Sequence, residues 1–583
     1  MIAQHLKQKS VIFAGLAYIA LSLFHIPDKI FRHGFDKNAP AQLFALLIAA
    51  GGYSIFVALK RERFNFAPLV QYGALSLLLT QLASLLMSGS LISSLIGDTG
   101  RYVGTISTIA LVVVALFHTQ FRFEAFITLL RYYVIAIELI VLIALAQHFK
   151  LIELPGDHGM TSTLGNIDFF AAFVGTSLPL IFLLAMYSSI RIRVALVGAA
   201  LLNVIALRFA GPLQGYLDIA FAVLGIAIFF ARKYIPRRNW TLNARTYVGT
   251  FAVVIWAEFI FLMPFLGDFV PVLGNDVQVK IRSNFWLAGT RQFFSHPLLG
   301  VGPDQYGNNY EQYRTLEDIV KYTNILSNDA HSASVQTLAT VGILGTLAFL
   351  FLIALVIRSI LILWDSRAID RRATFVISLY IFIYLTNSFI SPITLTHKYL
   401  FWAVCGFVVG QVYRLQSRKS ERKLSIAASA LSAGAIFFSL AVVFAQGQIN
   451  YLSNIEKYAK DNSVVLDYNS SQILPCAMFF DAELLIAKNA GAERASALAD
   501  EKLASNPRCV AAQTYLTQRA VDAGEVATLG PLVYRLFEIA PARSQTLSLA
   551  MYYANRSGDL VLREAVEKEM KALGLVYIPG KLG

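Results

Sequence analysis

Charged residues are scarce in this 583-residue chain: Asp, Glu, Lys and Arg make up 15% of it, whereas 56% is hydrophobic. Ordinary soluble domains carry about 25% charged residues. This shortage excludes a soluble globular protein for most of the chain and indicates that the lipid bilayer is its main solvent. The net charge of +13 does not indicate a nucleic-acid partner, because the basic residues stand between apolar runs and form no continuous basic face.

Cysteine is also rare, with only three residues, so no disulfide scaffold is predicted. Cys405 lies in an apolar run, where a buried thiol is expected. Cys476 and Cys509 lie in the polar C-terminal region, and the sequence leaves open whether they form a disulfide. The chain has no P-loop and no Cys/His cluster of zinc spacing, so neither a cofactor nor a metal is predicted.

No small-residue cleavage site follows the first apolar run, which indicates a retained signal anchor. Thirteen apolar stretches are long enough to cross about 30 Å of hydrocarbon as helices. These stretches are residues 10–27, 41–59, 66–89, 101–119, 124–147, 168–188, 193–209, 212–231, 246–266, 332–357, 373–391, 397–413 and 424–446. The sequence therefore predicts an all-α, polytopic membrane bundle of about 12–13 spans. Within it, 193–209 and 212–231 must form a hairpin with a very tight turn.

Lys and Arg in the short loops predict the orientation, because cytoplasmic loops retain them. With a cytoplasmic N-terminus, the inside segments hold 22 such residues and the short outside loops hold 7. This predicts an N-terminal bundle of about nine spans (1–266), a large non-cytoplasmic loop (267–331), C-terminal transmembrane helices (332–446) and a non-cytoplasmic tail (447–583) in an inner-membrane protein. Three acidic residues fall inside spans, Glu138, Asp218 and Glu258, and are expected to be functional or paired between helices.

The tail from 447 has the composition of a soluble domain. Pro507 and Pro541 each close a helical stretch and lie 34 residues apart, which is the period of tetratricopeptide repeats. The pattern predicts a few degenerate helical hairpins. Such hairpins bind a protein partner or act as a structural cap.

The outer loop carries the residue types that group transfer requires. Neither ATP nor nucleotide sugars are available outside the cytoplasm, so a transferase there needs a donor activated on a lipid, for which a pyrophosphate is the obvious group. Arg282, Arg291 and Arg314 could bind it through their planar guanidinium groups, or could contact lipid headgroups. His331 stands where the loop returns to the membrane as a helix, and is either a general base or a structural residue.

Aromatic residues surround these cations. Trp286, Tyr306, Tyr310 and Tyr313 are candidate contacts for a glycan, because rings stack on sugar faces, although membrane interfaces are also rich in Trp and Tyr. His296 precedes Pro297 and is expected to be a turn residue.

The order of these residues resembles the O-antigen ligase and polymerase family. The resemblance rests on Arg282, Trp286, the HPLLGVG run from 296 to 302, Tyr310, the AHS at 330–332, Gln336 and the GILG at 342–345. It covers about 65 residues, with a weaker match in TLGNIDFFAAF at 163–173.

The resemblance implies a GT-C-like membrane glycosyltransferase that needs no metal and uses an undecaprenyl-pyrophosphate-linked glycan donor. It implies His331 as the base and Arg282 and Arg291 as donor-binding residues. Where the family often has S-R-G, this chain has Leu213, Gln214 and Gly215, so the nearby Arg208 is a candidate substitute, with Gln214 and Asp218 as supporting residues. Ser332 replaces the family's Asn after the His.

The acceptor is left open by these motifs, which polymerases, lipopolysaccharide ligases and protein O-oligosaccharyltransferases share. A polymerase or ligase is the first expectation. A transporter or flippase for lipid-linked glycans is the rival from a different class, but it predicts repeated halves and broken helices, and no convincing internal repeat is present.

Overall fold

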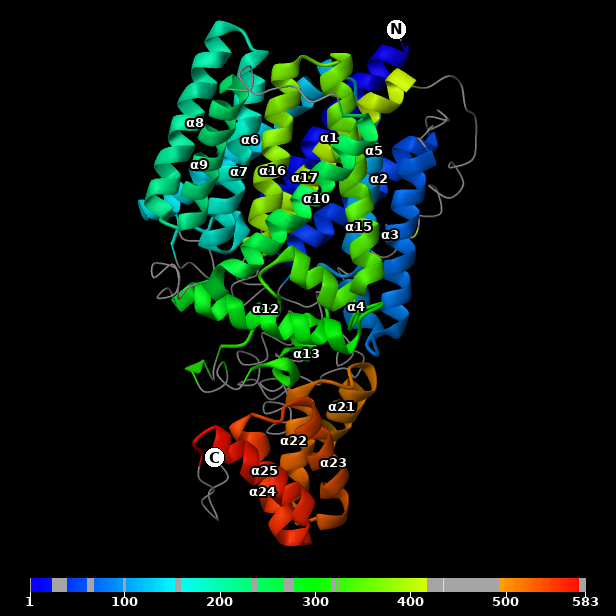
Figure 1. The fold of residues 1–583 in the computed structure, drawn as a ribbon, viewed down its shortest axis with the longest axis vertical. Helices are drawn as coiled ribbons and strands as arrows, with labels where there is room; N and C mark the ends of the chain where they lie inside the picture. Colours follow the sequence, from blue (N-terminus) through cyan, green and yellow to red (C-terminus); the bar gives the residue numbers. More distant parts are fainter. Residues whose placement is uncertain are drawn as a thin grey trace, which may run out of the picture. The chain divides into compact units, whose positions relative to one another are not determined.

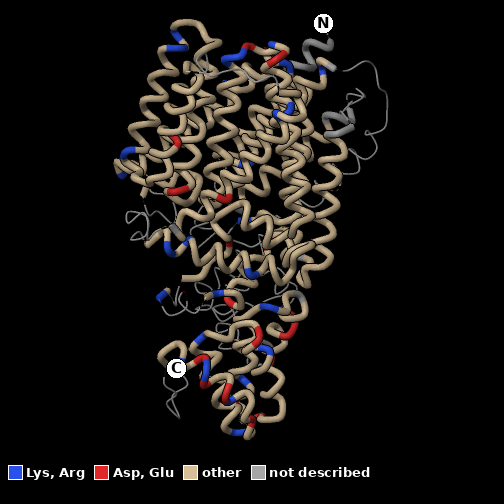
Figure 2. The backbone as a smooth tube through the Cα atoms, in the orientation of Figure 1, with Lys and Arg blue, Asp and Glu red and all other residues tan. Residues whose placement is uncertain are grey.

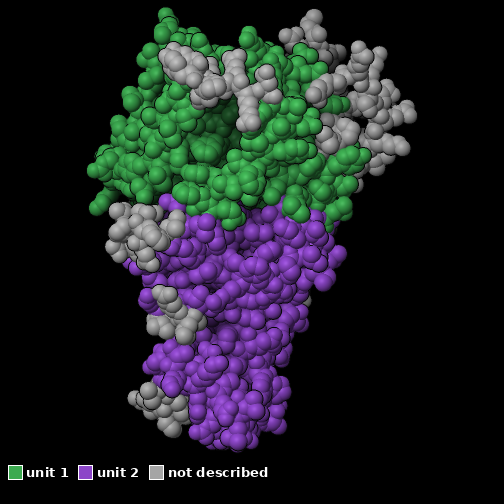
Figure 3. Space-filling view, in the orientation of Figure 1, with its two compact units in different colours: residues 1–79, 99–260, 347–444 green, residues 80–98, 261–346, 445–583 purple. Residues whose placement is uncertain are grey.

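The computed structural model describes residues 2–23, 39–59, 68–97, 101–152, 159–231, 240–266, 277–315, 318, 321–322, 325–416, 434 and 492–575. It is 83% helical, and no strand occurs in these ranges, so the predicted all-α fold is confirmed. The chain divides into two compact units (Figure 3): unit 1 comprises 1–79, 99–260 and 347–444, and unit 2 comprises 80–98, 261–346 and 445–583.

Apolar helices of unit 1 run side by side (Figure 1) and make this a multi-pass membrane protein. Eight helices in the described part of the chain are long and apolar enough to span a bilayer. They lie in α3 (Pro68–Met87), α6 (Phe123–His148), α7 (Ile167–Met186), α8 (Ile190–Ala210), α9 (Leu213–Ala231), α10 (Leu242–Leu262) with the short η3 (Met263–Leu266), α15 (Ala333–Ser366) and α16 (Arg371–Ile390).

Four further predicted spans also fall on helices. They are α1 (Ile2–Leu23), α2 (Ala39–Leu59), α5 (Thr105–His118) and α17 (Leu395–Gln416), of which the first three contain shorter apolar stretches. The thirteenth prediction, 424–446, lies outside the described residues except for one position. The very tight turn predicted between α8 and α9 is confirmed, because only two residues separate these helices, and both helices pack on α7.

Most of the length of the unit 1 helices carries neither acidic nor basic residues, and charged positions are few within the bundle (Figure 2). Among the eight candidate spans, α7 and α16 are the most buried; they pack on each other, and α9 packs on both. Asn166 caps the start of α7 by accepting a hydrogen bond from the Asp168 N–H at 2.7 Å. The GNID segment of the sequence therefore has a local structural role in beginning a buried helix.

Unit 2 contains the predicted outer loop and the described part of the tail. The loop contributes α12 (Val277–Ser295) and the short α13 (Tyr306–Tyr313), next to the short α4 (Leu91–Ile96). The tail contributes five amphipathic helices, α21 (Ala492–Ser505), α22 (Val510–Asp522), α23 (Val526–Ile539), α24 (Ser544–Ser557) and α25 (Leu560–Ala572). Each tail helix packs on the next, which confirms the predicted helical hairpins.

Candidate functional site

His331 occupies a strained backbone position at the start of α15. Its φ is +54°, in the left-handed region that residues other than Gly adopt uncommonly, although Asn, Asp and His do so more often than the rest. The Asp329 carboxylate accepts a hydrogen bond from the His331 N–H at 2.6 Å, and the Gln336 side chain accepts one from the Ala330 N–H at 2.8 Å. These two contacts hold the turn, at a conformational cost of about 1–3 kcal/mol that the surroundings must offset.

The imidazole of His331 packs against α12. Its ring centroid lies 5.1 Å from that of Phe285, and Phe285 is 4% exposed. Arg282 lies one turn earlier on the same face of α12, because residues three and four apart are neighbours on a helix. Arg291 is nine residues from Arg282 and therefore points about 180° away. Its guanidinium is exposed and donates to the Arg314 carbonyl at 3.1 Å.

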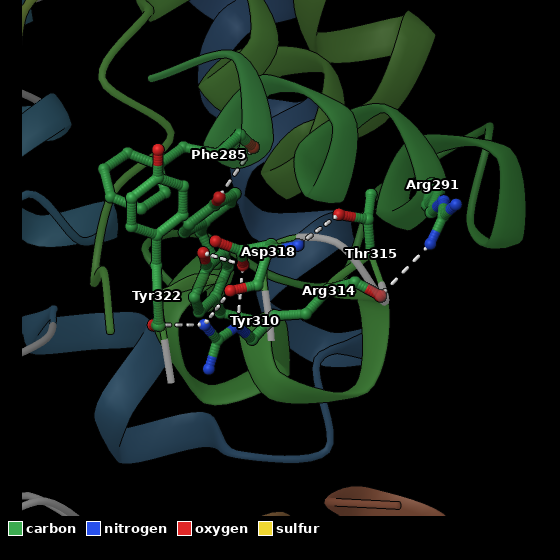
Figure 4. Close-up of polar contacts among 8 residues, drawn as sticks. Phe285, Arg291, Tyr310, Arg314, Thr315, Asp318 and Tyr322 are labelled. Carbon is green, nitrogen blue, oxygen red and sulfur yellow. Dashed lines mark hydrogen bonds and ion pairs between the residues drawn. The ribbon is translucent and has the colours of Figure 1, made fainter. Parts of the chain in front are cut away.

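Arg314 is held inside the loop (Figure 4). Its Nε donates to the Asp318 carboxylate at 2.7 Å, and its Nη2 donates to the Tyr322 carbonyl at 2.7 Å. The side chains of this ion pair are only 6% and 1% exposed. The Tyr310 hydroxyl donates to the same carboxylate at 2.8 Å. These contacts give Arg314 a role in organising the loop. They also occupy the guanidinium group through which Arg314 was predicted to bind the donor phosphate.

Three of the four candidate sugar-contacting rings are buried. Trp286 stacks on Phe261 with ring centroids 5.9 Å apart, and Tyr306 donates its hydroxyl to the Phe285 carbonyl at 2.7 Å. Burial first, and then the Asp318 carboxylate, raise the pKa of Tyr310, so its hydroxyl stays a donor. Trp286, Tyr306 and Tyr310 therefore form the interior of the loop, and among the four candidates Tyr313 is the one that is partly exposed.

The HPLLGVG segment packs backbone to backbone against a kink in α15 at Gly342. The Val301 and Gly302 N–H groups donate to the carbonyls of residues 339 and 340, at 2.9 and 3.0 Å. In return, the N–H of Ile343 donates to the Pro297 carbonyl at 2.8 Å. Backbone groups on both sides of the kink thus find partners in the loop, as buried polar groups require. The two glycine-containing motifs therefore form one structural interlock.

A buried polar cluster lies in unit 1. The Asn387 Nδ2 donates to both Asp218 carboxylate oxygens at 2.9 Å, and the Gln214 Nε2 donates to the Asn387 Oδ1 at 2.7 Å. The expected interhelical pairing of Asp218 is confirmed, and Asn203 pairs with Glu138 in the same way at 3.0 Å. Arg208, near the end of α8, is exposed.

Within unit 2, His331 and Tyr306 of α13 both contact Phe285 of α12, the helix that also bears Arg282, whereas Arg291 of that helix contacts the Arg314 carbonyl. Ser332 is 3% exposed, with its Oγ 3.0 Å from that of Ser334. Sequence reasoning missed Phe285, Asp329 and the bracing role of Gln336. The D-A-H-S turn before an apolar helix was the available sign of that brace, because Asp favours such turns.

Comparison of the chain with protein-family models and with curated proteins finds no match to either.

Proposed function

We propose that this protein transfers a glycan from an undecaprenyl-pyrophosphate-linked donor to a hydroxyl acceptor at the non-cytoplasmic face of the inner membrane. The observation that carries the proposal is the strained, braced position of His331 against the helix that bears Arg282. Strain of this kind persists where the surroundings enforce it, and it concentrates at functional sites. The ordered resemblance between residues 282 and 345 supplies the reaction class.

In this mechanism, His331 takes the proton of the acceptor hydroxyl while the hydroxyl oxygen attacks C1 of the donor sugar. The bond from C1 to the pyrophosphate oxygen breaks, and lipid pyrophosphate leaves with the bonding electrons. Positive charge on Arg282 offsets the negative charge that develops on the leaving group. The acceptor is a growing polysaccharide or a lipopolysaccharide core in the reading we favour, and a protein in the alternative reading.

The direct test is a transfer assay with the purified protein, a synthetic undecaprenyl-pyrophosphate oligosaccharide and a panel of glycan, lipid and peptide acceptors. We expect a longer or ligated glycan together with stoichiometric release of undecaprenyl pyrophosphate. If the protein is folded and the donor remains intact with every acceptor, the proposal is refuted.

Arg282→Ala is expected to weaken donor binding more than Arg291→Ala. Arg282 shares the face of α12 that carries Phe285, whereas Arg291 lies on the other side and contacts the Arg314 carbonyl. Losing one charge-assisted contact with phosphate costs about 1.5–3 kcal/mol, roughly tenfold or more in Kd. Binding of a fluorescent donor analogue to each variant measures this, and the opposite ranking would move the pyrophosphate to the Arg291 side.

A reporter fused after Gly583 is expected to be active only outside the cytoplasm, because the excess of inside Lys and Arg places the tail there. Cys509 supports this orientation, since it is fully buried and disulfide-bonded, and disulfides persist in oxidising compartments. The other tail cysteine, Cys476, lies outside the described residues. A reporter that is active in the cytoplasm would mean that one span has been miscounted.

A further inference from the structure

Within unit 2, the helix α13 lies between two neighbours. It packs on α12 through one face and on α23 of the tail through another. Only eight residues long, α13 is too short to be stable by itself, because isolated helices below about 12–15 residues are marginal in water. Its position therefore depends on what it touches.

Two tail arginines contact α13. Arg508 donates from Nη1 to the Gln312 side-chain oxygen, and the Arg543 Nε lies 3.8 Å from the Glu311 carboxylate. Arg508 stands directly before Cys509, which is fully buried, disulfide-bonded and the N-cap of α22. The Asn506 side chain accepts a hydrogen bond from the Arg508 N–H at 3.3 Å. The guanidinium thus projects from a fixed part of the tail.

Arg508 also acts on the end of α12. Partial burial, and then the positive charge of Arg508, lower the pKa of His296. His296 belongs to the HPLLGVG segment, and its carbonyl accepts the Gly300 N–H at 2.9 Å. The tail therefore contacts the loop at α13 and influences it electrostatically at the end of α12.

From α13 a chain of contacts leads to His331. The Tyr306 hydroxyl donates to the Phe285 carbonyl at 2.7 Å, and the Gln292 side chain donates to the Tyr306 carbonyl at 3.1 Å. The Phe285 ring lies against the imidazole of His331, with centroids 5.1 Å apart. A shift of α13 would therefore displace the ring that supports the imidazole.

We propose that Arg508 and Arg543 are positioning residues, through which the C-terminal helical domain fixes α13 and thereby the Phe285–His331 pair. The proposal rests on the proposed function for its catalytic consequence. The contact between the tail and α13 is testable without it.

The test compares the full-length protein with the variant Arg508→Ala/Arg543→Glu. Hydrogen exchange in Tyr306–Tyr313 is expected to become about tenfold faster, because a charge-assisted hydrogen bond is lost and an ion pair becomes a repulsion. In the transfer assay, kcat should fall by a similar factor while the donor Kd stays unchanged. Arg563→Glu is the control for the charge reversal, since Arg563 pairs within α25 with Glu567 at 2.7 Å and its replacement reverses one charge of the same domain, as Arg543→Glu does.

Charge exchange separates positioning from damage to the tail. Glu311→Arg alters α13 alone and should give a smaller loss of the same kind, and the double exchange Arg543→Glu/Glu311→Arg should recover most of it. Two results would overturn the proposal: a hydrogen-exchange rate in α13 that is unchanged in all these variants, or a kcat that the charge-swapped double variant does not recover. Faster α13 exchange in a protein that transfers no glycan would retain the positioning contact and refute the proposed function.

Discussion

Replacing His331 by asparagine is expected to leave a folded protein that has lost transfer by about 10²–10⁴-fold, the usual contribution of a general base. Asparagine is the informative choice because it tolerates the left-handed conformation that His331 adopts, at φ +54°. The hydrogen bond from the residue 331 N–H to Asp329 needs only the backbone. An amide cannot accept a proton near neutral pH, so the chemical step alone is removed.

The measurement is single-turnover transfer by purified His331→Asn, with donor binding and thermal unfolding recorded on the same sample. His296→Asn is the control, because it makes the same side-chain change at an exposed histidine of the same loop. We expect His296→Asn to transfer at near the wild-type rate and both variants to unfold at similar temperatures. Transfer by His331→Asn at that rate would exclude the imidazole from the mechanism.

Local sequence patterns predicted the helices well, because spans need long apolar runs and helix ends need breakers. The helix α12 ends at Ser295, just before the predicted break at His296 and Pro297. The helix α15 extends further than the predicted span 332–357, because it ends at Ser366. Hydropathy falls at Arg358, but helical hydrogen bonding does not require an apolar side chain, so α15 continues.

Side-chain direction in the loop was not predictable, because it depends on partners that are remote in sequence. Trp286 and Tyr306 are residue types expected to contact sugars. In the structure, however, the Trp286 ring stacks on Phe261, and the Tyr306 hydroxyl donates to the Phe285 carbonyl. The partner of Asp218, Asn387, is 169 residues away and carries no charge that would mark it. Of these contacts, the ion pair between Arg314 and Asp318 is the one that the local sequence could have indicated, because opposite charges four residues apart often pair.

The largest expected effect on stability comes from Gly300→Ala or Gly342→Ala. Both glycines have positive φ, +68° and +64°, and both stand where the loop and α15 meet through their backbones. A Cβ at Gly300 would lie 2.3 Å from the Thr340 carbonyl carbon, and one at Gly342 would lie 2.4 Å from the Leu298 carbonyl. Backbone cannot rotate away as a side chain can, so the interlock must separate. We expect a loss of about 4 kcal/mol or more, at the upper end of single-substitution effects.

Two control glycines divide this loss into its causes. Gly89 also has positive φ, +67°, but no atom lies within 4 Å of its added Cβ, so Gly89→Ala should cost only the conformational term of about 1–2 kcal/mol. Gly198 lies within the helix α8 with open space around it, so Gly198→Ala should be neutral or stabilising by up to about 1 kcal/mol. The unfolding temperature and the yield of monodisperse protein should be highest for Gly198→Ala and lower for Gly89→Ala. Both should be lowest for Gly300→Ala and Gly342→Ala. If Gly300→Ala unfolds no earlier than Gly89→Ala, strain at φ accounts for the whole effect and the backbone interlock does not hold the loop against α15.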